Sequence, residues 1–292
     1  MYYGAGLGAA LALTWTLAGC TPDRPSPDGA GAPASSAETP KAAPASVMVI
    51  VKASDFAFDA PAQVPAGAVT IQLENHGKEL HQAQLIKLED GKTVQDLAAA
   101  LKTHGPPPSW MKFVGGPNGI APGQQSNSTS VLAPGQYAYI CFIPSPDGIM
   151  HAAKGMVQPF EVTAAPSAAA NTLPGTDVTI KLVDFDFESS KPLKAGKQRI
   201  MVENAGPQAH EVVLVKLTPG KTIKDFAAWA ESMKGPPPAE PVGGVGVLEN
   251  GMRGIFTADL TAGDYGLICF VPDAKDGKMH LEHGMMKNIK VS

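Results

Sequence analysis

The chain has 292 residues, including 31 Gly and 27 Pro, and carries 23 Lys and Arg against 27 Asp and Glu, a formal net charge of -4. This length is enough for two ordinary domains, and the mildly acidic balance without a basic run argues against a nucleic-acid partner. The abundance of Gly and Pro favours strands and turns over a helical bundle.

The N-terminus begins with an apolar run that ends at Cys20. The run is short for a membrane-spanning helix and about the right length for the core of a signal peptide. Its last four residues, "LAGC" at 17–20, resemble a bacterial lipobox, which implies cleavage before Cys20 and attachment of a lipid to its sulfur. We therefore predict that residues 1–20 are a lipoprotein signal peptide. A plain secretory signal with an incidental Cys is the alternative.

Residues 21–46 are rich in Pro, Ala and Ser and show no hydrophobic period. Such a segment cannot bury a core and is typical of a flexible tether. A tether after a lipid anchor would hold the rest of the chain at a bacterial membrane, on its periplasmic or cell-surface side. Free thiols are oxidised in such compartments unless they are protected.

The remainder of the chain contains an internal repeat of domain size. "DFAF" at 55–58 recurs as "DFDF" at 184–187, and "LAPGQYAYICF" recurs as "LTAGDYGLICF". The offset is 129 from His81 to His210 and 128 from Cys141 to Cys269. We predict two copies of one domain, a first copy at 47–163 and a second copy at 176–292, joined by a linker at 164–175.

Within each copy, short apolar runs end at Gly, Asn or Pro and predict strands, enough for an antiparallel sandwich. In the first copy these runs are 47–53, 69–75, 82–88, 126–132, 137–143 and 158–163. One helix interrupts the strands of each copy. Thr93 and Thr222 are its predicted N-caps, and the triple prolines after Gly105 and Gly235 prevent its continuation.

Each copy carries two His, one Cys and one Met in the same order. The sets are His81, Cys141, His151 and Met156 in the first copy, and His210, Cys269, His280 and Met285 in the second. Two imidazoles, a thiolate and a weak thioether form the donor set of a blue-copper electron-transfer site. The soft sulfur donors suit Cu(I) and imidazole also suits Cu(II), so little must move when an electron passes.

The spacing around these residues resembles that of the cupredoxins, the superfamily of plastocyanin and azurin. The pattern N-x-G-x-x-x-H occurs at Asn75 to His81 and at Asn204 to His210, and Y-x-x-x-C follows in both copies. The resemblance implies an all-β fold of two tandem Greek-key β-sandwich domains, each with one inserted helix, and up to two copper ions held by the eight residues above. It also implies that His151 and His280 lie nearer the surface and pass the electron.

The loop from Cys to the second His has nine intervening residues in the first copy and ten in the second. This is longer than in the small cupredoxins and nearer to the long loop of copper nitrite reductases. Three other interpretations stay open. The first is that each Cys is an ordinary buried hydrophobe. The second is that Cys141 and Cys269 form a disulfide, and the third is that only one copy has kept its site.

The favoured function is a lipid-anchored extracytoplasmic copper protein that carries single electrons to or from a redox partner such as a cytochrome or an oxidase. Two-domain nitrite reductases and small multicopper oxidases share the architecture, but their catalytic copper needs further His ligands, typically beside the Cys. Here Ile140 and Phe142 flank Cys141, and Ile268 and Phe270 flank Cys269, so we do not predict an enzyme. A copper chaperone or buffer and a metal-free binding module are the alternatives.

Overall fold

The structure is a computed structural model that describes residues 46–103, 106–164 and 171–292. The predicted signal peptide with Cys20, nearly all of the predicted tether and part of the predicted linker lie outside the described residues. The described residues belong to one compact unit. The boundaries 47–163 and 176–292 therefore stay predictions, and we keep the terms first copy and second copy for these two ranges.

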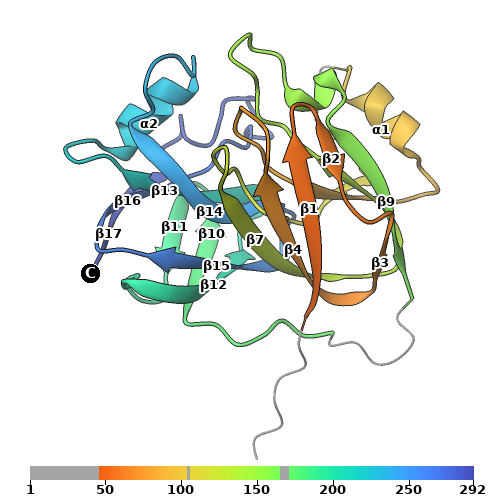
Figure 1. Cartoon of the computed structure of the whole chain (residues 1–292), viewed down its shortest axis with the longest axis horizontal. Coiled ribbons are helices and arrows are strands. Elements are labelled where there is room, and N and C mark those ends of the chain that lie inside the picture. The colour runs from red at the N-terminus through yellow and green to blue at the C-terminus, as the bar shows by residue number, and fades with distance from the viewer. Residues whose placement is uncertain (1–45, 104–105, 165–170) are drawn as a thin grey trace, which may run out of the picture. The chain divides into compact units, whose positions relative to one another are not determined.

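The first copy consists of two facing β-sheets (Figure 1). One has the order β2-β1-β4-β7 and the other the order β3-β9-β8-β5-β6. The strands are β1 (Val47–Ser54), β2 (Ala57–Asp59), β3 (Gln63–Pro65), β4 (Gly67–Asn75), β5 (Gln84–Leu88), β6 (Met111–Phe113), β7 (Gln125–Leu132), β8 (Gly135–Ile140) and β9 (Val157–Thr163).

The second copy has sheets of order β11-β10-β12-β15 and β14-β13-β16-β17. Its strands are β10 (Val178–Val183), β11 (Asp186–Ser189), β12 (Gly196–Asn204), β13 (His210–Leu217), β14 (Ala239–Leu248), β15 (Arg253–Leu260), β16 (Gly263–Ile268) and β17 (Met286–Val291). The order β11-β10-β12-β15 corresponds to β2-β1-β4-β7, and β14-β13-β16-β17 corresponds to β6-β5-β8-β9 of the first copy. Only β3 of the first copy has no counterpart among the described strands. The sheets are mostly antiparallel, but β1 is parallel to β4, β10 to β12 and β3 to β9.

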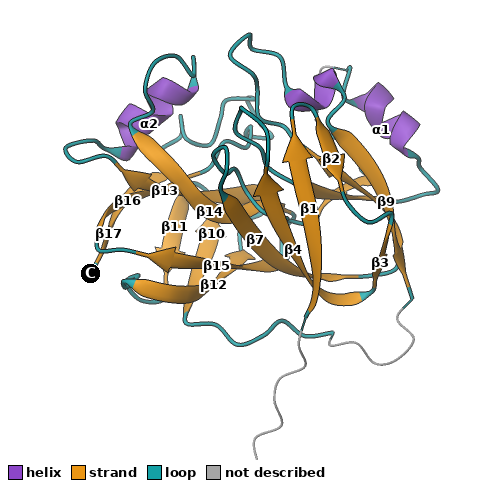
Figure 2. Ribbon diagram, viewed as in Figure 1, coloured by secondary structure: helices purple, strands orange, loops and turns teal. Residues whose placement is uncertain are grey.

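Many neighbouring strands in these sheets are distant along the chain, because the chain crosses from one sheet of a sandwich to the other. This connectivity and the scarcity of helix confirm the predicted all-β fold (Figure 2). Alternating side chains explain the layers. In β1 the odd-numbered Val49, Val51 and Ala53 are buried, and in β10 Val178, Ile180 and Leu182 are buried. The core of each copy lies between its two sheets.

The described residues form two α-helices, α1 (Val94–Ala100) and α2 (Ile223–Ala230), and the predicted N-caps are confirmed. The hydroxyl of Thr93 accepts a hydrogen bond from the backbone N–H of Asp96, and Thr222 does the same with Asp225. Each Asp side chain in turn accepts from the backbone N–H of its cap residue, which completes a capping box. Neither helix is long and apolar enough to cross a membrane, and no other described helix is.

The predicted strands agree with the structure except at short or polar segments. β2, β3 and β6 have only three residues each, too few to show a period. β14 contains Gly243, Gly244 and Gly246, and the sequence gives these residues no strand signal. α1 ends at Ala100 and α2 at Ala230, several residues before the triple prolines that were expected to limit the helices.

Candidate metal centre

The first candidate site gathers His81, Cys141 and His151, which the sequence analysis named from distant parts of the chain. One possible ligand atom from each side chain lies within 4.8 Å of the other two, and all three residues are buried. The Nδ1 atoms of His81 and His151 are 3.1 Å apart, and the Sγ of Cys141 is 3.3 Å from Nδ1 of His151. The backbone N–H of Gln82 also points to this sulfur, at 3.5 Å.

The second candidate site repeats this arrangement with His210, Cys269 and His280, again within 4.8 Å of one another and buried. The two Nδ1 atoms are 2.9 Å apart, and Sγ of Cys269 is 3.4 Å from Nδ1 of His280. In both copies two imidazole Nδ1 atoms and one sulfur therefore face a common point.

Met156 and Met285 are fully buried beside these clusters. Met156 packs in the same core cluster as Cys141, and Met285 packs in the same cluster as Cys269. The backbone carbonyl of each Met accepts a hydrogen bond from the backbone N–H of the Cys, at 3.3 Å in the first copy and 3.2 Å in the second. The role of each thioether as an axial ligand stays a prediction.

Carboxylates hold the far side of three of the four imidazoles. His81 Nε2 lies 2.7 Å from Asp55 Oδ1, and His210 Nε2 lies 2.6 Å from Asp184 Oδ1. His151 Nε2 lies 2.9 Å from Glu79 Oε2. A neutral imidazole that donates its Nε2–H to a carboxylate keeps a lone pair on Nδ1, so these contacts orient the nitrogen that a metal needs.

The fourth imidazole differs. The Nε2 atom of His280 is buried and has no hydrogen-bond partner among the described residues. The residue equivalent to Glu79 at an offset of 129 is Gln208, and its amide donates to Asp184 Oδ2 at 3.1 Å. The two sites thus share their possible ligands and differ in the carboxylate behind the second His.

None of the four histidines has exposed surface, so the expectation that His151 and His280 lie nearer the surface stays a prediction. Phe56 covers His151 with a ring-centroid distance of 4.9 Å, and Phe185 covers His280 at 5.1 Å. Lys154 Nζ lies 4.6 Å from the centre of the Phe56 ring, and the ring of His283 stacks on Phe185 at 4.7 Å. A second layer of side chains therefore separates each site from solvent.

The loops that carry the second His and the Met have the same backbone hydrogen bonds in both copies. In the first, Ala152 N donates to Cys141 O at 2.9 Å and Met156 N donates to His151 O at 2.9 Å. In the second, Leu281 N donates to Cys269 O at 3.1 Å and Met285 N donates to His280 O at 2.9 Å. The glycine before each Met has a positive φ, 103° at Gly155 and 98° at Gly284, which an L side chain rarely adopts.

The extra residue in the second loop lies away from the site. The turn is closed by Ser145 N donating to Ile149 O in the first copy and by Asp273 N donating to Lys278 O in the second, one residue more. The different Cys-to-His spacing therefore leaves the geometry of the possible ligands almost unchanged.

The N-x-G motif places the first His. Asn75 Nδ2 donates to Glu79 O at 2.8 Å and to Ile120 O at 3.0 Å, and its Oδ1 accepts from Gly77 N at 2.9 Å. Asn204 makes the equivalent contacts with Gln208, Leu248 and Gly206. A Cβ on Gly77 or Gly206 would collide with the imidazole of the first His and with its Asp partner, so only Gly fits.

Burial controls the protonation of the candidate ligands. It raises the pKa of the Cys141 thiol to about 12 and that of Cys269 further above its ordinary value. Burial also lowers the pKa of His81 and of His210, and it lowers the pKa of His280 to about 4, with a further contribution from the charge of His210. These three imidazoles are therefore held neutral, and metal binding must release the thiol proton.

Cys141 and Cys269 are free thiols, so the disulfide interpretation is wrong. One further cluster of possible ligands, Asp273, Asp276 and His283, is mostly exposed, and nothing else in the structure indicates that it holds an ion.

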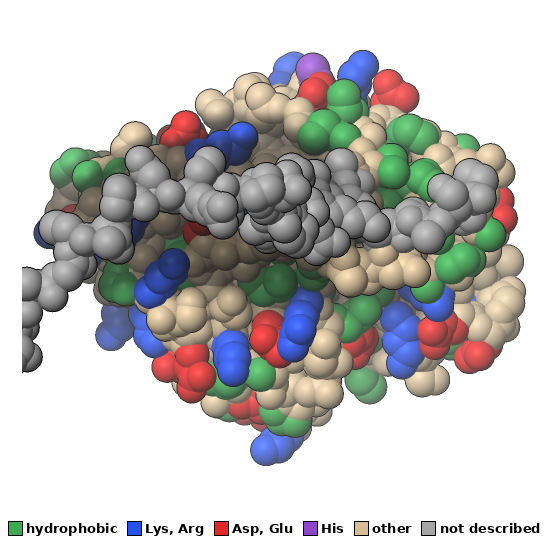
Figure 3. Space-filling view, turned by 90° about the horizontal axis from the view of Figure 1, so that it is seen from below, with side chains coloured by type: hydrophobic (Ala, Val, Ile, Leu, Met, Phe, Trp, Pro, Cys, Tyr) green, Lys and Arg blue, Asp and Glu red, His purple; other side chains and the backbone are tan. Residues whose placement is uncertain are grey.

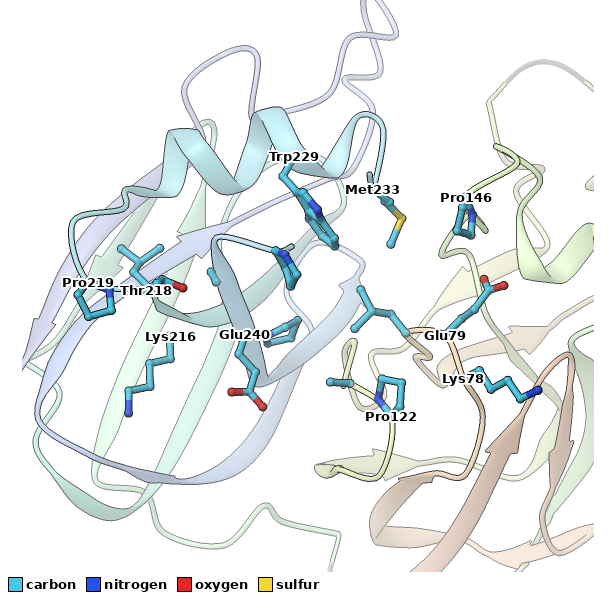
Figure 4. A pocket seen from close by; sticks show the side chains of 16 residues that line it. Lys78, Glu79, Pro122, Pro146, Lys216, Thr218, Pro219, Trp229, Met233 and Glu240 are labelled. Carbon is cyan, nitrogen blue, oxygen red and sulfur yellow. The ribbon is translucent and has the colours of Figure 1, made fainter. Parts of the chain in front are cut away.

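Glu79 connects the first site to a groove on the molecule (Figure 4). The groove has a volume of about 690 Å³ and is lined by residues of both copies, including Pro146, Trp229 and Met233. The side chain of Glu79 is 28% exposed although its partner His151 is buried. This carboxylate is therefore a polar link between a candidate ligand and solvent.

The residues around the ligands were not predicted from the sequence. Asp55 and Phe56 form one dipeptide that contacts both histidines of the first site, and Asp184 and Phe185 repeat it in the second. The signal was present, since "DFAF" and "DFDF" were among the repeated segments. Glu79 carried no such signal, because its counterpart is Gln208.

The residues fit a copper ion. The donor atoms converge, the histidines are oriented through their other nitrogen, and the set of one thiol and two imidazoles with a neighbouring thioether matches the preferences of copper. When bound, such an ion supplies one-electron chemistry by changing between Cu(I) and Cu(II).

Comparisons with known proteins gave no matching family model and no matching curated protein. Among solved structures, the chain is similar to the auracyanin of Roseiflexus castenholzii, with 22% identity over 42% of this chain and 99% of that one and a TM-score of 0.30. Auracyanin A of Chloroflexus aurantiacus has 20% identity over 41% and 99%, with a TM-score of 0.29. A blue copper oxidase of Nitrosomonas europaea has 16% identity over 85% and 86%, with a TM-score of 0.26.

Proposed function

We propose that this chain is a copper protein that carries single electrons at two sites, one in each copy. The observation that carries the proposal is the convergence of two imidazole nitrogens and one thiol in each copy. The proposed ligands are His81, Cys141, His151 and Met156, and His210, Cys269, His280 and Met285.

The surroundings of the sites favour electron transfer over copper storage or delivery. A protein that hands copper to others needs ligands that a partner can reach, whereas these side chains have no exposed surface. Carboxylates, packed rings and matching loop hydrogen bonds hold the ligands in place before metal binds. A rigid site that changes little between oxidation states is the requirement for rapid one-electron exchange.

The proposed partner is a redox protein such as a cytochrome or an oxidase, and the proposed location is the outer side of a bacterial membrane, with Cys20 carrying the lipid. The lipobox-like "LAGC" supports the anchor. In cells given labelled palmitate, the wild-type chain should take up label and Cys20→Ser should not. Equal labelling of both would contradict the anchor.

Titration with Cu(II) tests the copper sites. The wild type should bind two copper ions per chain and show strong visible absorption from the thiolate. Cys141→Ser and Cys269→Ser should each lose the absorption of their own site and keep the other. Absence of tight copper binding and of any visible band in the wild type would contradict the proposal.

A further inference from the structure

A hydrogen-bonded bridge crosses from the second copy to the first beside the two candidate sites. Its central residue is Glu211, which follows His210 and is 6% exposed. Glu211 Oε1 accepts from the backbone N–H of Phe270 at 3.2 Å, and Phe270 follows Cys269. Glu211 Oε2 accepts from Asn118 Nδ2 in the first copy at 2.9 Å. One carboxyl group thus touches both ligand segments of the second site and the opposite copy.

The bridge continues from Asn118 to the first site through Gly119 and Ile120. The backbone N–H of Gly119 donates to Asn118 Oδ1 at 2.7 Å. Ile120 then pairs with His81, since His81 N donates to Ile120 O at 3.3 Å and Ile120 N donates to His81 O at 3.0 Å. The complete path runs through covalent bonds and hydrogen bonds, without a jump across a van der Waals gap.

Structural stability alone does not account for the bridge. A carboxyl group buried between the two copies costs free energy that its hydrogen bonds offset only in part, and well-packed apolar side chains often replace such groups without loss. The equivalent residue of the first copy, Gln82, makes no side-chain hydrogen bond to the second copy among the described residues. A side-chain link of this kind is therefore present at Glu211 and not at the equivalent position in the first copy.

A second polar link exists but is longer. Gln84 Oε1 accepts from Val247 N at 2.6 Å, and its Nε2 donates to Val247 O at 3.1 Å. This link reaches a site only after further cross-strand steps, from Gln84 to Ile140 and from Leu248 to His210. The Asn118–Glu211 link joins the segments that carry His81, His210 and Cys269 directly.

We propose that the Asn118–Glu211 bridge conducts one electron between the two copper sites, so that the chain is an internal relay. This inference rests on the proposed function. One electron leaves a Cu(I) site, which becomes Cu(II), and reduces the Cu(II) of the other site to Cu(I), with no atom transferred and no other reactant used. Electron flow runs from the first site to the second, because a carboxylate behind His151 favours Cu(II) there and His280 has none.

Rapid photoreduction of the fully oxidised protein tests the relay. Met156→Gln serves as the background, because a changed axial ligand alters the band and the potential of one site and makes the two distinguishable. After the initial reduction, electrons should pass from the first site to the second in a first-order phase whose rate does not depend on protein concentration. In this phase the absorption band of the first site should recover while that of the second is lost. Asn118→Ala should slow this phase several-fold, and Glu211→Gln should also slow it.

Asn127→Ala is the matched control, because Asn127 also joins the copies through side-chain hydrogen bonds, to Thr257 at 2.9 Å, but contacts no ligand segment. It should leave the first-order phase unchanged, and Gln84→Ala should change it less than Asn118→Ala. A structural readout accompanies the kinetics. Hydrogen exchange of the Phe270 amide in the Cu(I) protein should be slow in the wild type and faster in Glu211→Leu.

The outcomes separate the two proposals. Failure to load two coppers would contradict the proposed function itself. If the protein binds two coppers and the Asn118 and Glu211 variants keep the spectra of their Met156→Gln background, two results would overturn the relay and leave the carrier function standing. One is the absence of a first-order phase, and the other is a phase whose rate Asn118→Ala does not change. A phase slowed by Gln84→Ala alone would also overturn it.

Discussion

Asp55 and Asp184 each hold the first histidine of a site through a short contact, and the phenylalanine after each Asp covers the second histidine. One dipeptide therefore fixes the orientation of two imidazoles. Such outer contacts set the tautomer and the basicity of a ligand, so they influence both metal affinity and potential. The difference between Glu79 and Gln208 is the clearest residue-scale difference between the two sites.

Glu79→Gln should weaken Cu(II) binding at the first site by about tenfold, because the carboxylate that increases the basicity of His151 is lost. If Cu(I) binding is unchanged, the potential of that site rises by about 59 mV. Redox titration followed by visible absorption measures this shift.

Asp147→Asn is the control, since Asp147 lies in the same ligand loop and pairs with Lys154 at 2.8 Å but does not contact a candidate ligand. It should leave the potential within error of the wild type. A potential unchanged in Glu79→Gln, or shifted equally in both variants, would contradict this interpretation of Glu79.

Gly206→Ala should weaken copper binding at the second site and leave the first site intact. The new Cβ would lie 2.7 Å from His210 Nε2 and 2.8 Å from Asp184 Oδ1, so the contact between the two must open. Competition with a copper chelator measures the loss. Gly175→Ala, where a Cβ meets nothing within 4 Å, should bind like the wild type. Retention of both affinities in Gly206→Ala would show that the contact is dispensable.

At the scale of elements, each inserted helix depends on its capping box. Thr222→Ala should destabilise the protein by about 1 kcal/mol, because the N–H of Asp225 loses its acceptor at the start of α2. Chemical denaturation measures the change. Lys224→Ala, at an exposed position of the same helix, should cost less because Ala is a strong helix former. Equal stability of Thr222→Ala and the wild type would contradict the role of the cap.

The same cap predicts a pH dependence. Hydrogen bonds from the side chain and then the backbone of Thr222 lower the pKa of Asp225. A carboxyl group with a lowered pKa stabilises the folded state above its ordinary pKa, and this contribution disappears as the pH falls through the lowered value. The protection factors of the α2 amides, which correct for the intrinsic pH dependence of exchange, should therefore fall on acidification in that range. Protection factors that do not respond to acid would contradict it.

Sequence patterns predicted the long elements and the possible ligands, but not the short elements. Strands such as β1 and β10 alternate buried and exposed side chains and are readable from the sequence. β6 and the glycine-rich β14 are defined by their pairing with β5 and β13, which no local pattern contains. The cover of His151 by Phe56 and of His280 by Phe185 escaped prediction for the same reason, because both phenylalanines come from a distant strand connection.

At the scale of the whole described unit, the two copies share a sheet. β7 of the first copy pairs with β15 of the second, so that one eight-stranded sheet contains strands of both. Bridges between Val114 and Leu248, Pro117 and Val245, and Ile120 and Val242 run antiparallel across the contact. The charges on the face shown in Figure 3 are of both signs and interspersed.

Two glycines let the segments at this contact lie close against strands of their own copies. Gly116 and Gly244 have φ values of 113° and 137°, and a Cβ on either would collide with a backbone carbonyl of its own copy, Ala83 O or Val212 O. The segments that contain them lie against the strands that follow the first His of each site. The contact between copies is therefore built next to both candidate metal centres.

Because the copies share a sheet and buried hydrogen bonds, residues 46–292 should unfold in a single transition. Copper bound only at the first site, as in Cys269→Ser, should raise the temperature of that whole transition, since a ligand of the folded state stabilises everything that unfolds with it. Scanning calorimetry measures this. Two transitions, of which copper shifts only one, would show that the copies unfold independently.

The central claim is that each copy gathers its His, Cys and Met side chains around one copper ion. Anomalous diffraction from crystals of the copper-loaded protein, measured on both sides of the copper absorption edge, tests it most directly. We predict two copper peaks per chain, one bonded to Cys141 Sγ and Nδ1 of His81 and His151, the other to Cys269 Sγ and Nδ1 of His210 and His280. Well-ordered clusters without a copper peak, or copper bound only at surface groups such as Asp276 and His283, would contradict the account.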